Sequence, residues 1–186
     1  MAAPARHWRF TVDDYEQMGV TGIFHEDDRV ELIEGEIYEM SPIGGPHVEC
    51  INGLNMMFAR SAPEGILVSI QNPVRIGDLS MPQPDVVVLR DRRFSGKVPT
   101  SDDVLLIVEV SDTTLRYDRD VKMPLYAQAG VPEAWIAEVN REEIIAHRDP
   151  VGGEYQEIRT YVKGESLSPV HLPEIIVRVD DVFGGS

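Results

Sequence analysis

The 186-residue sequence has a single cysteine, Cys50, so no disulfide can form within the chain. One thiol is typical of proteins in a reducing compartment. No apolar run approaches the length that crosses a membrane, and the opening MAAPARHWRF lacks the apolar segment of a signal peptide. We therefore expect a soluble, cytoplasmic protein with no membrane partner. The length favours one domain over residues 1–186.

Basic residues are also scarce, with 17 Lys and Arg against 32 Asp and Glu and a formal net charge of −15. A field of this sign repels the phosphates of a nucleic acid at long range. A nucleic-acid partner would need local basic groups. Two such groups occur: Arg90, Arg92, Arg93 and Lys97, then Arg116, Arg119 and Lys122. The simpler interpretation is that most of these side chains solvate loops.

Several signatures of well-known active sites are missing. The sequence has no P-loop, no dinucleotide-binding fingerprint and no Ser/His/Asp signature. The spacing His47-x-x-Cys50 is compatible with a soft metal, but no second pair accompanies it. These absences exclude simple assignments to nucleotide hydrolysis or serine hydrolase chemistry.

Two short apolar runs each carry one carboxylate. Asp85 precedes the run at 86–89, and Glu109 follows the run at 104–108. Runs that are apolar on both faces are typical of interior strands. Because burial of a bare carboxylate is costly, each acid must be paired, protonated or bound to a metal.

A divalent cation would account for both acids. Two carboxylates 4 Å apart repel each other by about 4 kcal/mol at an effective dielectric near 20, and a cation reverses that sign. The carboxylates of Asp85 and Glu109, with a backbone carbonyl assigned to Val110, suit Mg²⁺ or Mn²⁺. Lys122 would then orient a water molecule or hold a phosphate oxygen. The alternative is that both acids make structural hydrogen bonds and that Lys122 is a solvated helix residue.

The remaining chain predicts alternating helices and strands. Thr11 and Asp14 form a capping box for a short helix, and Gly35 is placed in the turn of a hairpin. Further on, the pattern predicts a helix at 47–60, strands at 66–70 and 73–76, a helix from about Asp120 to Gly130, a strand at 131–139, a hairpin at 142–148 and 154–161, and an edge strand at 173–183 with a docked Phe183. This order indicates an α/β or α+β domain.

Four motifs occur in a fixed order: VELIEGEIYEMSPIGGPH, QPDVVVL, IVEVSDTT and the D-x-x-x-K of DRDVK. Together they resemble the Uma-type putative restriction endonucleases of the PD-(D/E)XK nuclease superfamily, over roughly residues 11–139. The resemblance implies a restriction-endonuclease-like core at about 46–139, with a mixed central sheet flanked by helices. Residues 1–45 would add a helix and a hairpin, and residues 140–186 a hairpin and an edge strand.

The resemblance also implies roles for particular residues. Pro84-Asp85 would be the PD element and Glu109 the second acid. Ser111 stands where the superfamily has its lysine, and Lys122 matches a lysine that has migrated to the next helix. The implied activity is metal-dependent phosphodiester hydrolysis by a DNA endonuclease, with Mg²⁺ or Mn²⁺ as cofactor and a homodimer as a candidate assembly. The charge of −15 motivates an alternative, a binding or assembly module with weak or lost catalysis.

Three further residues are minor catalytic candidates. His47 matches a family histidine and opens a helix, where a loop-packing role is the alternative. Glu34 lies at the hairpin turn, where a solvated acid is the simpler interpretation, and Gln83 either contacts substrate or caps the strand. We also interpret Asp118 as a helix cap and Tyr126 as a core residue.

Overall fold

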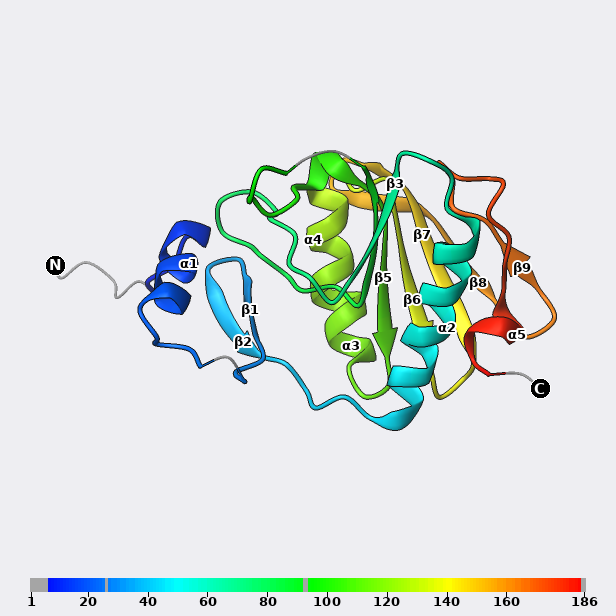
Figure 1. Ribbon diagram of the computed structural model, residues 1–186, viewed down its shortest axis with the longest axis horizontal. Coiled ribbons are helices and arrows are strands. Elements are labelled where there is room, and N and C mark those ends of the chain that lie inside the picture. Colours follow the sequence, from blue (N-terminus) through cyan, green and yellow to red (C-terminus); the bar gives the residue numbers. More distant parts are fainter. Residues whose placement is uncertain (1–6, 26, 92–93, 185–186) are drawn as a thin grey trace, which may run out of the picture.

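The computed structural model describes residues 7–25, 27–91 and 94–184. A six-stranded sheet forms its centre, in the order β3-β4-β5-β6-β7-β8 (Figure 1). The strands are β3 (Ile66–Ile70), β4 (Val86–Arg90), β5 (Val104–Ser111), β6 (Glu133–Glu138), β7 (Glu143–Val151) and β8 (Glu154–Tyr161). β5 and β6 are parallel and all other neighbours antiparallel, so the predicted mixed α/β sheet is confirmed.

The sheet is apolar on both faces because a helix covers each one. Val86 and Val88 point toward α2 (Gly45–Ser61), where Leu54 and Phe58 are buried against them. Val87 points to the opposite face, which is covered by the helical segment after β5. Successive strand residues alternate between faces, and each buried side chain of this size stabilises the fold by roughly 1.5–3 kcal/mol. This two-sided burial explains the continuous apolar runs in the sequence.

The N-terminal region forms the predicted helix and hairpin. The capping box between Thr11 and Asp14 begins α1 (Val12–Val20). β1 (Val30–Ile33) and β2 (Glu36–Glu39) are joined by a two-residue turn in which Gly35 has φ 83°. Such tight hairpin turns require positive φ, which glycine adopts without strain. Backbone hydrogen bonds between Leu32 and Met81 attach the hairpin to the loop before β4.

Two predicted elements between the hairpin and β6 are wrong in part. Residues 73–76 form no strand and make only isolated bridges, because Pro73 and Gly77 interrupt the run. The predicted helix near Asp120 starts earlier, at Leu115. It consists of α3 (Leu115–Tyr117), the π-helical turn η2 (Asp118–Lys122) and α4 (Met123–Gln128). A short 3₁₀ turn, η1 (Ser101–Asp103), precedes β5.

The C-terminal region also differs from the expectation. The predicted hairpin is present, but as β7 and β8 it extends the central sheet to its edge. The predicted edge strand at 173–183 shrinks to β10 (Val177–Arg178), which pairs with β9 (Ser166–Leu167) in a separate small sheet. α5 (Val179–Val182) follows, and Phe183 packs against the core as expected. No helix in the described part of the chain is long and apolar enough to span a membrane.

Candidate active site

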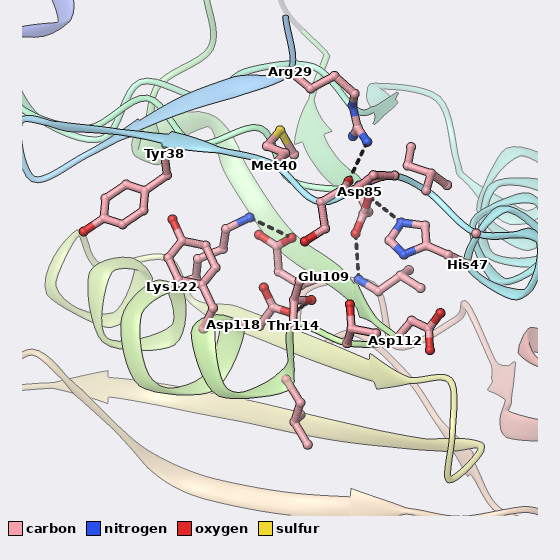
Figure 2. Close-up of a pocket in the computed structure, with 18 of the residues that line it drawn as sticks. Arg29, Tyr38, Met40, His47, Asp85, Glu109, Asp112, Thr114, Asp118 and Lys122 are labelled. Atoms are coloured by element: carbon pink, nitrogen blue, oxygen red, sulfur yellow. Dashed lines mark hydrogen bonds and ion pairs between the residues drawn. The ribbon is translucent and has the colours of Figure 1, made fainter.

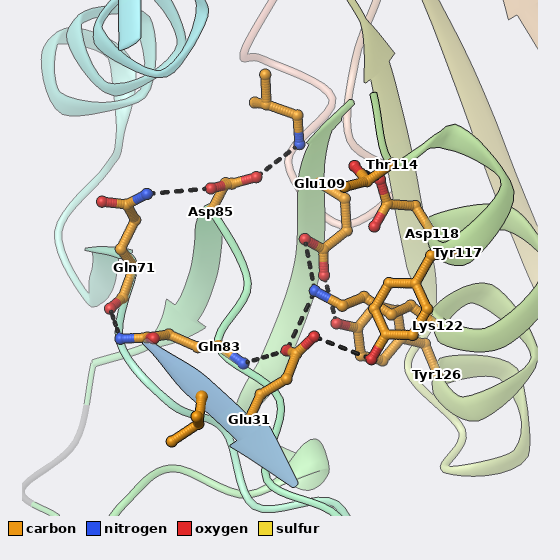
Figure 3. A network of polar contacts seen from close by, with 12 residues as sticks. Glu31, Gln71, Gln83, Asp85, Glu109, Thr114, Tyr117, Asp118, Lys122 and Tyr126 are labelled. Atoms are coloured by element: carbon orange, nitrogen blue, oxygen red, sulfur yellow. Dashed lines mark hydrogen bonds and ion pairs between the residues drawn. The ribbon is translucent and has the colours of Figure 1, made fainter. Parts of the chain in front are cut away.

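Strand alternation brings the two predicted acids to the same face of the sheet. Asp85 directly precedes β4 and Glu109 lies in β5, and the register pairs Val86 with Val108. Because Val86 and Val108 point toward α2, their neighbours Asp85 and Glu109 point to the opposite face, toward the helix that carries Lys122. Figure 3 shows this convergence. Both acids are buried, with 6% and 2% of their surfaces exposed.

Three groups contact the carboxylate oxygens of Asp85. Its Oδ1 lies 3.0 Å from His47 Nε2 and accepts from Gln71 Nε2 at 3.2 Å. Its Oδ2 accepts the Val110 backbone N–H at 2.8 Å. Burial by itself raises the pKa of Asp85, but the bonds from His47, Val110 and Gln71 outweigh it and hold the pKa below its usual value. Asp85 is therefore ionised at neutral pH.

Glu109 lies deeper and is bound by two side chains from the helix. Lys122 Nζ lies 3.3 Å from Glu109 Oε2, and the Tyr126 hydroxyl donates to Oε1 at 2.5 Å. Burial raises the pKa of Glu109 well above its usual value. Lys122 opposes this shift, and the nearby charges of Asp118, Asp85 and Glu31 add to it. Burial is thus the main reason that the charged form of Glu109 is disfavoured, and a bound cation would favour that form.

Glu31 completes the site and was not anticipated from the sequence. Its Oε2 lies 3.2 Å from Lys122 Nζ and accepts the Gln83 N–H at 3.2 Å, and its Oε1 accepts the Tyr117 hydroxyl at 3.1 Å. Lys122 is consequently held between the carboxylates of Glu31 and Glu109. Burial alone would lower the pKa of Lys122, but these acids raise it, so the amine keeps its charge. In the sequence, Glu31 is one polar position of an ordinary alternating strand.

Asp118 is a site residue rather than a helix cap. Thr114 is the N-cap residue of α3, and Asp118 lies one turn later, buried, where it accepts the Thr114 hydroxyl at 2.7 Å. Burial raises the pKa of Asp118, with Lys122 opposing the shift. Thr114, Asp118, Lys122 and Tyr126 recur every four residues, so they share one face of the helix. This spacing was the available signal for Asp118 and for the polar role of Tyr126.

These groups line a cavity of about 710 Å³ between the N-terminal hairpin, the start of α2 and the helix at 115–128 (Figure 2). Of the predicted site residues, the cavity wall includes His47, Asp85, Glu109, Val110 and Lys122. Figure 2 shows His47 on one side of Asp85 and Lys122 on the other, with Tyr38 beyond Lys122. The structure thus brings the three principal candidates and His47 into one pocket.

Glu34 and Gln83 do not line this pocket. The Glu34 side chain is exposed at the hairpin turn, and its backbone N–H donates to Ser80 Oγ at 2.8 Å. Gln83 Nε2 donates to the carbonyl of Gln71 at 2.6 Å. Gln83 therefore supports the loop that carries Asp85, and Glu31 is the acid that the hairpin contributes in place of Glu34.

The basic groups noted in the sequence are dispersed. Arg92 and Arg93 lie outside the described residues. Lys122 is buried, and Arg119 pairs with Asp120 at 2.7 Å. Arg116 lines the pocket together with Arg29, which the sequence did not single out. Arg29 and Arg116 therefore supply local positive charge at the pocket.

The donor set fits a hard divalent cation bound by a small number of protein oxygens. Among the described residues, no three His, Cys, Asp or Glu side chains form a ready metal cluster. Asp85 and Glu109 nevertheless line the same pocket, and a strand residue presents its N–H and C=O to the same neighbour. The Val110 carbonyl therefore faces the side from which its N–H reaches Asp85. Oxygen ligands completed by water are what Mg²⁺ prefers.

Comparison with known proteins agrees with this geometry. A solved structure described as a putative nuclease belonging to DUF820 from Anabaena variabilis ATCC 29413 has a TM-score of 0.72 and 15% identity to this chain, covering 95% of this chain and 98% of that one, which shows a shared fold. The curated proteins gave no significant match. Restriction-endonuclease-type enzymes generally use divalent metals. Residues 12–180 match the family described as "Uma2: Putative restriction endonuclease". The resemblance of the four sequence motifs is thereby confirmed, and the chain belongs to the Uma2 family of putative restriction endonucleases.

Proposed function

We propose that this protein hydrolyses phosphodiester bonds of DNA with the help of a divalent metal ion. One observation carries the proposal. Asp85 and Glu109 lie on one face of two neighbouring strands, and the amine of Lys122 lies 3.3 Å from Glu109 in the same pocket. Two acids and a lysine are the groups required to bind a cation and to stabilise the charge that develops on a phosphate.

Each residue has a distinct role in this proposal. Asp85 and Glu109, with the Val110 carbonyl, would hold Mg²⁺ or Mn²⁺, which supplies positive charge to the phosphate and lowers the pKa of water. Lys122 would donate to a phosphate oxygen or orient the attacking water. His47 fixes one oxygen of Asp85 through its 3.0 Å contact and borders the same cavity.

Glu31 would act as a positioning residue for Lys122. In the usual superfamily pattern the lysine follows the second acid by two residues, but here Ser111 occupies that place. A lysine on a helix needs another constraint to point at the site. The 3.2 Å ion pair with Glu31, itself fixed by Gln83 and Tyr117, provides that constraint.

A DNA cleavage assay tests the proposal. Purified protein would be incubated with plasmid and with oligonucleotide DNA in Mg²⁺, in Mn²⁺ and in EDTA, beside Asp85→Asn, Glu109→Gln and Lys122→Met. We expect metal-dependent cleavage that each substitution lowers by at least about 10²-fold. Glu16→Gln, an exposed acid on α1, is the control and should cleave normally. Cleavage that persists in EDTA, or that ignores Asp85 and Lys122, contradicts the proposal.

A second candidate is a binding or assembly module that retains the fold with weak or lost catalysis. The net charge of −15 favours it, because a protein that binds duplex DNA normally presents a broad basic surface. Absence of DNA binding even at low salt would support the module. Size-exclusion chromatography would test for a homodimer, an assembly that could cut both strands of a duplex.

A further inference from the structure

The candidate active site is lined by two chemically different groups of side chains. One group comprises the buried acids and Lys122. The other comprises Tyr38, Met40 and Leu115, with Tyr117 between the two groups because its hydroxyl donates to Glu31. A nucleotide has a similar division, with the flat face of a base at one end and a charged phosphate at the other. Tyr38 and its apolar neighbours are therefore a candidate site for a nucleobase.

Two neighbouring tyrosines, Tyr38 and Tyr117, line the pocket. The rings of Tyr38 and Tyr117 lie 5.5 Å apart with an interplanar angle of 44°. Two contacts hold Tyr117 in place: its hydroxyl donates to Glu31, and Lys122 Nζ lies 5.7 Å from its ring centre. Tyr38 is 37% exposed, and its hydroxyl donates to Glu36 Oε2 at 3.0 Å. A partly exposed aromatic side chain at the lining of a pocket is suited to base stacking.

The depth of the acids argues against an intact duplex as the substrate. Asp85, Glu109 and Lys122 are 6%, 2% and 3% exposed. The bases of a duplex are stacked on each other, and the duplex is stiff over roughly 150 base pairs. A single strand can bend into a cavity of about 710 Å³ and present an unstacked base there.

The same inference explains how a chain with a charge of −15 can bind nucleic acid. Duplex binding relies on many phosphate contacts, each made by a Lys or Arg. Stacking needs no positive charge, and Arg29 and Arg116, which line the pocket, would each contact a phosphate.

We propose that the pocket accepts a single-stranded segment of nucleic acid, with one base stacked on Tyr38 and the adjoining phosphate directed toward Lys122. The proposal rests on the proposed phosphodiesterase function and specifies its substrate class. Tyr38 acts in it as a substrate-binding residue and takes no part in the bond-breaking step.

Binding and cleavage of matched oligonucleotides test this proposal. The probes are one fluorescently labelled single strand, the same strand annealed to its complement, and a strand of equal length and charge that lacks bases. Binding is measured by anisotropy with Ca²⁺, and cleavage with Mg²⁺. We expect the single strand to bind and to be cleaved at least about tenfold better than either other probe. Tyr38→Ala should remove this preference, whereas Tyr38→Phe, which keeps the ring, should retain it.

The outcomes separate this inference from the proposed function. Equal binding of the strand without bases, tighter binding of the duplex, or an unchanged preference in Tyr38→Ala overturns the stacking proposal, even if the enzyme cleaves. If no probe is cleaved in an Asp85-dependent way, the nuclease function is overturned. Anisotropy then still decides whether Tyr38 binds a base. A thermal melt of each variant verifies that the hairpin region remains folded.

Discussion

Lys122 is the residue on which the geometry of the site depends. It is 3% exposed and contacts Glu31 at 3.2 Å and Glu109 at 3.3 Å. A buried lysine without such partners would lose its proton. With both acids present, its charge persists and its amine is fixed between their carboxylates.

Glu31→Gln tests whether Glu31 acts through Lys122. The substitution keeps the shape but removes one charge from the ion pair, so we expect kcat to fall about 10-fold to 100-fold with a smaller change in KM. Because Glu31 also raises the pKa of Lys122, the variant should lose activity at a lower pH on the alkaline side. Both effects are read from steady-state rates across a pH series.

A double variant separates positioning from simple destabilisation. If Glu31 acts through Lys122, then Glu31→Gln combined with Lys122→Met should be no slower than Lys122→Met alone. Rates that multiply would mean that Glu31 contributes independently, and the positioning role would be wrong.

Glu109 makes the metal-free site pH-sensitive in a defined direction. The pKa of Glu109 in the folded state is raised above the ordinary value of 4.5. The folded state therefore binds this proton more tightly than the unfolded chain does. Stability is then fully present below the unfolded pKa and is lost as pH rises through the raised folded pKa. We expect the melting temperature in EDTA to decline as pH rises above about 4.5, and less so in Glu109→Gln.

Metal addition provides the complementary measurement. Mg²⁺ should raise the melting temperature of the wild type at neutral pH and have a smaller effect on Glu109→Gln, because binding to the folded state stabilises it.

Asp85 contributes a pH dependence of the opposite sign to the melting temperature. Its lowered pKa stabilises the fold at higher pH, and that stabilisation is lost on acidification. A wild-type melting temperature that keeps rising through neutral pH would contradict a raised pKa of Glu109 in the folded state.

For single residues, the sequence predicted the candidates that lie in motifs, but it missed the side chains that contact them. Asp85, Glu109 and Lys122 were identifiable because apolar runs and the D-x-x-x-K spacing mark them. Glu31 was not, because contacts with Lys122, 91 positions away, depend on how the hairpin docks. The local pattern assigns Glu31 to a strand and Glu34 to the turn, but it does not show that the polar face of that strand is buried, where Glu31 is 2% exposed.

Among the elements, the N-terminal hairpin does more than extend the fold. It contributes Glu31 to the buried network and Tyr38 to the pocket wall, and it is fixed by Leu32 and Met81. Gly35 at its turn accepts the Phe10 N–H and donates to the Leu79 carbonyl. The hairpin therefore depends on a small number of contacts to hold its two functional side chains in place.

Gly35→Ala tests this dependence. Gly35 has φ 83°, and an added Cβ would lie 2.6 Å from Arg9 Cβ and 3.1 Å from its Cα. We expect about 1–2 kcal/mol of backbone strain, faster amide exchange in β1 and β2, and reduced activity. Gly65→Ala is the matched control, because Gly65 has φ 85° with no atom near the added Cβ. It should show similar strain with normal activity. Equal loss of activity in both variants would argue against a specific role for the hairpin.

The predicted helices and strands were correct where the apolar periodicity was strong, and their bounds were wrong where backbone hydrogen bonding set where an element begins or ends. The strands β4 and β5 and the hairpin β7/β8 followed from their patterns. The start of the Lys122 helix did not, because the polar residues 111–120 are typical of a turn, although the helix begins at Leu115. A π-helical turn follows, in which the Met123 N–H donates to the carbonyl of Asp118, five residues back. This wider turn precedes Pro124, which cannot donate a helical hydrogen bond, and such turns are frequent at functional sites. The tail was missed because its valines satisfy both a strand and the short α5.

For the whole molecule, the strongly negative net charge opposes the nucleic-acid binding that the candidate site suggests. The net charge of −15 cannot be attributed to the site alone, since most of the 32 acids lie elsewhere. Near the pocket, Arg29 and Arg116 are the cations at the wall that remain partly accessible, and Lys122 is committed to Glu31 and Glu109. Under the proposed function, binding of nucleic acid would combine weak local attraction with long-range repulsion.

These two contributions respond to salt in opposite directions. Local contacts with a single strand lower log K by about 0.7 per phosphate for each tenfold rise in salt, so two arginines would give a slope near −1.4. Screening of the long-range repulsion offsets part of that loss. We expect a plot of log(kcat/KM) against log[salt] to be shallower than about −1.4, and Arg29→Gln with Arg116→Gln to flatten it further or reverse its sign. A slope several times steeper would require an extended phosphate-binding surface, and the single-strand pocket would then be the wrong description of how this chain meets its substrate.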